Sequence, residues 1–118
     1  MNSPQISIQE RTKKLAVRIV KACSQIEVRS STLRILSNQL LRSGSSVGAN
    51  CSEAKSAQSR KDFINKYEIA LKEARETLYW IEVIIESQLI DAKKLEGLVQ
   101  EVEEVIKILA ATVKKLKA

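Results

Sequence analysis

The sequence contains no histidine among its 118 residues. This absence removes the commonest general base, the usual base partner of a serine or cysteine nucleophile, and the commonest metal ligand. It also argues against a di-metal carboxylate bundle, because such sites are built from Glu-x-x-His pairs. The acids that could face a core, Glu53, Glu73 and Glu76, are predicted to form salt bridges instead. The expected partners are Arg42, Lys66 and Arg75. We therefore predict no enzyme, no metal and no cofactor, and a metal-dependent or hydrolytic enzyme is the least favoured hypothesis.

Proline and glycine are almost as scarce, with one proline, Pro4, and three glycines. Sheet proteins need many turns, so this composition indicates a few long helices. No apolar run approaches the roughly 18–20 residues that a membrane span needs, and residues 1–5 lack the apolar core of a signal peptide. We expect a cytoplasmic protein without a membrane segment, in which Cys23 and Cys51 stay reduced as small buried apolar side chains.

Aromatic residues make up only 3 % of the chain. Base reading in RNA and stacking on single strands both use exposed aromatic side chains. Phe63, Tyr67, Tyr79 and Trp80 look mostly structural. If the protein binds nucleic acid, we expect contacts to phosphates and to shape more than to bases.

What the sequence does contain is helical periodicity from end to end. Ser7 followed by Glu10 forms a capping box, and serines or an aspartate precede the later apolar stripes. The expected helices span residues 7–28, 31–57, 60–87 and 92–116. Residues 1–118 are thus predicted to be a single domain of the all-α class, an antiparallel up-and-down four-helix bundle with short connectors.

The second predicted helix contains a run that looks locally like a loop, residues 43–50, with two glycines and three serines. The apolar spacing nevertheless continues through it at helical intervals, so we favour a continuous helix over a break near residues 43–46. The small side chains predict close packing against a neighbouring helix, with Asn50 hydrogen-bonded to that neighbour. The close-packing residues are Gly44, Val47, Gly48, Asn50 and Cys51. Residues 44–48 also match G-x-S-x-G, but without a strand or a histidine the match is a coincidence.

Charge is distributed unevenly around a formal net charge of +6. Residues 1–61 hold 11 Lys/Arg and 3 Asp/Glu, a balance of +8, whereas residues 62–118 hold 9 and 11, a balance of −2. Two interpretations stay open: the halves attract each other within or between subunits, or the basic half binds nucleic acid. The candidate phosphate contacts are Arg11, Lys13, Lys14, Arg18, Lys21, Arg60 and Lys61.

The end of the third predicted helix is apolar nearly all the way round. A helix in a small monomer needs only one buried face, so the second face predicts contact with another subunit. Trp80 lies off the main stripe and is the expected anchor of that contact. The predicted interface residues are Tyr79, Trp80, Val83 and Ile84.

These segments carry a family resemblance. The sequences LLRSGSSVGAN at 40–50, AQSRKDF at 57–63 and IALKEARETLYW at 69–80 resemble the bacterial four-helix-bundle family, also called the 23S rRNA intervening-sequence protein family. The resemblance implies a left-handed up-and-down bundle that assembles into homopentamers, sometimes encoded inside inserts of 23S rRNA genes. It also implies a distant relationship to the accessory variability protein of diversity-generating retroelements, which works with nucleic acid. It implies no catalytic residue. Family members often have proline in the small-residue segment, where this chain has Gly48, so we expect a less kinked helix.

Two functional hypotheses follow. The first is a non-enzymatic homo-oligomer, pentameric by the family resemblance, whose basic surface binds structured RNA or DNA. The alternative is a protein–protein interaction scaffold that binds no nucleic acid, its charge asymmetry serving self-assembly.

Overall fold

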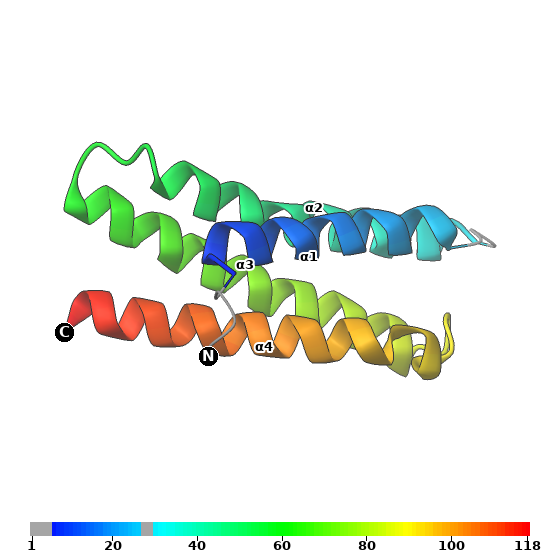
Figure 1. The fold of residues 1–118 in the computed structure, drawn as a ribbon. Coiled ribbons are helices and arrows are strands. Elements are labelled where there is room, and N and C mark those ends of the chain that lie inside the picture. The colour runs from blue at the N-terminus through cyan, green and yellow to red at the C-terminus, as the bar shows by residue number, and fades with distance from the viewer. Residues whose placement is uncertain (1–5, 27–29) are drawn as a thin grey trace.

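Four α-helices follow one another along the part of the chain that the structure describes, residues 6–26 and 30–118 of a computed structural model. They are α1 (Ile8–Gln25), α2 (Ser31–Ala54), α3 (Arg60–Glu86) and α4 (Ala92–Lys117). Figure 1 shows them side by side, with the α1–α2 and α3–α4 connections at one end and the α2–α3 connection at the other. The predicted all-α antiparallel bundle is confirmed. None of the helices in the described ranges is both long and apolar enough to cross a membrane.

Each helix begins at a polar side chain that satisfies a free backbone N–H group. The Ser7, Ser30 and Ser59 hydroxyls accept from the N–H of the residue three positions later, at 3.0–3.1 Å. The Asp91 carboxylate accepts from the Lys93 N–H at 3.0 Å. The caps therefore fix where the helices start, and the predicted starts lie within one residue of the observed ones.

The predicted helix ends are less accurate. The first was expected to reach residue 28, but α1 ends at Gln25, and residues 27–29 lie outside the described part. The second was expected to reach residue 57, but α2 ends at Ala54 and continues as a tight turn, in which Ser56 N–H donates to Glu53 O. The position in phase with Ala54 one turn later is the polar, exposed Gln58, so the buried stripe does not continue into another helical turn. The ends of α3 and α4 differ from prediction by one residue.

The small-residue segment is helical throughout, because α2 runs without interruption from Ser31 to Ala54. Gly44 lies against the Ile19 side chain, and Gly48 lies against the α1 backbone at Thr12. Val47 and Cys51 are fully buried on the same face. The two glycines therefore lie at the close contact between α1 and α2.

Asn50 does not have the predicted role. Its Nδ2 donates to Ser46 O at 2.9 Å and lies 3.1 Å from Ser46 Oγ, both within α2. Other residues bond α2 to its neighbours: Gln9 of α1 donates to Cys51 O at 3.3 Å, and the Thr77 hydroxyl of α3 donates to the buried Ser43 hydroxyl at 3.1 Å. Asn50 is two residues after Gly48, about 200° around the helix, so it does not face α1 and its amide bonds within its own helix.

Two of the three expected cationic partners, Arg42 and Lys66, pair with the core-side acids, whereas Arg75 forms no ion pair within the described residues. Arg42 of α2 pairs with Glu73 at 3.4 Å and with Glu76, both on α3. Lys66 of α3 pairs with Glu53 of α2 at 3.5 Å. These contacts link the two antiparallel helices along the edge of the α2–α3 packing.

The two cysteines are free thiols in the structure. Cys51 is fully buried, whereas Cys23 is half-buried with its Sγ 3.7 Å from Ser37 O. Burial raises the pKa of both thiols above the ordinary value of 9.0, and a hydrogen bond with Thr12 partly offsets this for Cys51. Burial thus favours the neutral thiol over the thiolate at both positions.

Iodoacetamide at pH 8 is expected to alkylate Cys23 well before Cys51, because Cys51 has no solvent access and its thiolate is scarce. Mass spectrometry of peptides sampled over time measures the two rates. The unfolded thiols ionise at lower pH than the folded ones, so the free energy of unfolding should also fall as pH rises above about 9. Equal alkylation rates in the folded protein would contradict the burial of Cys51.

Candidate nucleic-acid interface and assembly surface

The basic residues of α1 are divided between two sides of that helix. Arg11, Lys14, Arg18 and Lys21 recur at intervals of three and four residues and so form one row, here called the basic row. Arg11 and Arg18 both contact α4, which places the row on the α4 side. Lys13 belongs to the opposite row, whose members Gln9 and Cys23 contact α2.

Arg11 is held by carboxylates of its own subunit. Its guanidinium bonds Glu101 at 3.0 and 3.2 Å and Glu104 at 2.8 Å. The bidentate contact with Glu101 raises the pKa of Arg11, with Glu104 adding to the effect. The backbones of α1 and α4 approach each other less than any other neighbouring pair, so this ion pair is the main polar link between them. Arg11 is therefore engaged within the bundle.

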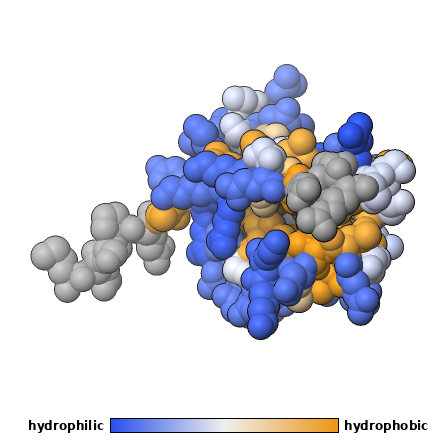
Figure 2. Space-filling model, turned by 90° about the vertical axis from the view of Figure 1, so that its right-hand side faces the viewer, coloured by the Kyte–Doolittle hydropathy of each residue, from blue (hydrophilic) through white to orange (hydrophobic). Residues whose placement is uncertain are grey.

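Arg18 lies across α4 at Gly97. A Cβ atom at residue 97 would come within 2.7 Å of Arg18 Nη2, so the absence of a side chain there lets the guanidinium lie over the helix. Farther along, Lys94 of α4 lines a hollow with Gln25 and Ile26 at the end of α1. The basic row thus extends from α1 to the start of α4. Figure 2 views this end of the bundle and shows hydrophilic residues around a hydrophobic centre.

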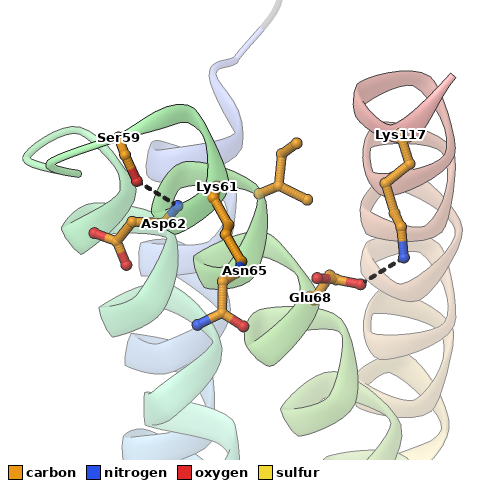
Figure 3. A pocket seen from close by; sticks show the side chains of 7 residues that line it. Ser59, Lys61, Asp62, Asn65, Glu68 and Lys117 are labelled. Carbon is orange, nitrogen blue, oxygen red and sulfur yellow. Dashed lines mark hydrogen bonds and ion pairs between the residues drawn. The ribbon is translucent and has the colours of Figure 1, made fainter.

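Arg60 and Lys61 do not join the basic row. Arg60 donates to Leu116 O at 2.9 Å, near the end of α4, whereas Lys94 is at its beginning. The 22 residues between them correspond to about 33 Å of helix. Lys61 borders an open hollow of about 620 Å³ in which Lys117 pairs with Glu68 at 2.9 Å and Asp62 lies beside Ser59 (Figure 3). The hollow mixes both charge signs, so it does not concentrate positive potential.

The predicted interface on α3 is partly at the surface. Tyr79 is 56 % exposed and meets Trp80 edge to face at 5.1 Å between ring centroids. Trp80 is half-buried, and its Nε1 donates to Glu76 at 2.9 Å. Val83 is half-buried, but Ile84 is fully buried. Ile84 is therefore a core residue, and its inclusion in a surface interface was wrong, because it continues the stripe of Thr77 and Ile81.

Sequence reasoning missed the α4 side of this site. Lys94 was not a candidate, and neither Glu101 nor Glu104 was assigned to Arg11, from which they are 90 and 93 residues away. The only available signal was the acidic run early in α4 opposite a basic α1. That signal predicts attraction but no specific pair.

Comparison with known proteins gives one family. A model of the family described as 23S rRNA-intervening sequence protein matches residues 5–111. The crystal structure of a protein with unknown function from the S23 ribosomal protein family of Bacteroides thetaiotaomicron VPI-5482 is similar, with a TM-score of 0.78 and 39 % sequence identity. The similarity covers 92 % of this chain and 99 % of that one. Comparison with curated proteins gives no match, and no enzyme family is indicated.

Proposed function

The chain belongs to the 23S rRNA-intervening sequence protein family, and we propose that it is a cytoplasmic, non-enzymatic homopentamer. The proposed homopentamer binds structured RNA or DNA through contacts to phosphates. The observation that carries the proposal is the basic row on the α4 side of α1. Within the described ranges, three of its members, Lys14, Arg18 and Lys21, are exposed and form no ion pair.

The geometry of the row suits a phosphate backbone. Lys14, Arg18 and Lys21 are spaced over seven residues, which is about 10 Å of helix. No aromatic side chain belongs to α1, so neither base stacking nor base reading is provided there. Lys and Arg contacts to phosphates release counterions and give affinity that falls with salt. The row therefore supports recognition of charge and shape.

The triple variant Lys14→Glu/Arg18→Glu/Lys21→Glu is expected to bind structured RNA and duplex DNA at least about 100-fold more weakly than the wild type. The slope of log affinity against log salt should fall by about three, one unit for each lost phosphate contact. Fluorescence anisotropy at several salt concentrations measures both quantities. The matched control is Lys72→Glu/Lys107→Glu/Lys114→Glu, which makes the same change in net charge at exposed positions outside the row.

Equal losses in the two variants would mean that net charge, and not the row, determines binding. No binding by the wild type even at low salt would leave the second hypothesis, a protein-interaction scaffold. One observation weighs against the first hypothesis: Arg11, a predicted phosphate contact, is paired with Glu101 and Glu104 of its own subunit. Under the second hypothesis high salt should dissociate the oligomer, and nucleic acid should have no effect on it.

A further inference from the structure

The exposed apolar side chains of the helices gather in two places. Val17 and Val20 on α1 are 47 % and 49 % exposed, and Leu41 on α2 is 36 % exposed. Cys23 contacts Ser37 across the two antiparallel helices. Val20 is one turn back from Cys23, and Leu41 is one turn on from Ser37, so the two lie at the same level. Val17, Val20 and Leu41 together are called the first patch.

The second patch lies on the outer side of α2 and α3. Arg42 pairs with Glu76. Ile35 is two turns before Arg42 on the same side of α2, and Val83 is two turns after Glu76 on the same side of α3, so Ile35 and Val83 are neighbours. Ile35 is 61 % exposed, and Tyr79 and Trp80 adjoin Val83. The second patch consists of Ile35, Tyr79, Trp80 and Val83.

The charges around the two patches are complementary. The residues one turn from Val17 on α1 include Lys13, Lys14 and Lys21. The residues around Tyr79 and Val83 on α3 include three glutamates and one arginine, and Glu76 among them is paired with Arg42 of α2. They are Glu76, Glu82, Glu86 and Arg75. An apolar centre with a basic rim on one surface thus matches an apolar centre with a mainly acidic rim on the other, which favours attraction between unlike patches and repulsion between like ones.

We propose that the first patch of one subunit binds the second patch of the next copy of the same chain, a head-to-tail contact that deepens the proposed function, because it rests on the chain being a homo-oligomer. The two patches share α2 and lie on adjacent sides of the bundle, not on opposite sides. Each contact therefore rotates one subunit relative to the next. A head-to-tail series of subunits related by such a rotation closes into a small ring. Lys14 and Lys21 of the basic row border the first patch, whereas Arg11 and Arg18, which contact α4, lie outside the subunit contact.

Two variants and their mixture test this contact. Val17→Glu/Val20→Glu removes the first patch, and Tyr79→Glu removes the second, in each case at exposed positions that should keep the fold. Each variant alone is expected to be a monomer by light scattering. An equimolar mixture should form a dimer with one chain of each variant, because one intact pair of patches remains. Ala111→Glu, an exposed change on α4 outside both patches, is the control and should keep the wild-type mass.

Wild-type mass for Val17→Glu/Val20→Glu, or a mixture that stays monomeric, would overturn the head-to-tail contact while leaving a homo-oligomer in place. If the second patch instead bound the second patch of another copy, Val17→Glu/Val20→Glu would keep the wild-type mass and only Tyr79→Glu would be monomeric. A wild type that is monomeric at every concentration would overturn the oligomer itself. Circular dichroism of each variant verifies that the loss of mass is not a loss of fold.

Discussion

Gly48→Ala is expected to lower the free energy of unfolding by about 2 kcal/mol or more, although alanine is the better helix former by about 1 kcal/mol. A Cβ atom at residue 48 would lie 2.9 Å from Thr12 O, 3.1 Å from Thr12 C and 3.3 Å from Lys13 N. These are backbone atoms of α1, so no side-chain rotation can relieve the contact. The helix has to move outward, and it takes with it the buried Leu15 and Ile19. Urea denaturation followed by circular dichroism measures the loss.

The same substitution at the other two glycines provides the controls. Gly97→Ala meets only the flexible end of Arg18, so we expect a gain of about 0.5–1 kcal/mol from helix propensity. Gly44→Ala meets the Ile19 side chain, which can shift in part, so its effect should fall between the two. If Gly48→Ala were as stable as Gly97→Ala, α1 could not lie as close to α2 as the structure places it.

The sequence predicts the fold well where local physical chemistry decides it. The continuity of α2 through its glycines follows from spacing alone, because Leu40, Gly44, Val47 and Cys51 keep one face in phase. The helix starts follow from single serines whose hydroxyls satisfy free N–H groups. In both cases the deciding contacts are within four residues or belong to one stripe, so they can be read without knowing what lies opposite.

The candidate site was harder to predict, because its arrangement depends on contacts between distant helices. Arg11 and Lys14 look equivalent in the sequence, but only Arg11 lies opposite Glu101 and Glu104. Arg60 looks like a further phosphate contact, but it binds a carbonyl group at the far end of the bundle. Which cations are engaged depends on which residues of α4 lie opposite them. Periodicity predicts which face of a helix a residue lies on. It does not predict which residues of a neighbouring helix lie opposite that residue.

The wrong assignment of Ile84 to a surface interface shows that neighbouring residues of a helix can lie on its buried and its exposed sides. Val83 and Ile84 are both β-branched apolar residues in a run that is apolar all round, and the run alone does not say which of them is buried. The phase of Thr77 and Ile81, seven and three residues earlier, decides in favour of Ile84, which is fully buried, whereas Val83 turns toward the surface beside Tyr79. A polar substitution at Ile84 should therefore affect stability, whereas the same substitution at Val83 should affect assembly.

Ile84→Asn is expected to lower the free energy of unfolding by about 4 kcal/mol, because it removes buried apolar atoms and places an amide in the core without a hydrogen-bond partner. That loss is comparable to the whole stability of many small domains, so the variant should be largely unfolded. Val83→Asn, one residue away, should cost less than about 1 kcal/mol and stay folded, but light scattering should give it a lower mass than the wild type. A folded Ile84→Asn variant with reduced mass, beside a Val83→Asn variant of wild-type mass, would reverse the two assignments and place Ile84 at the subunit contact.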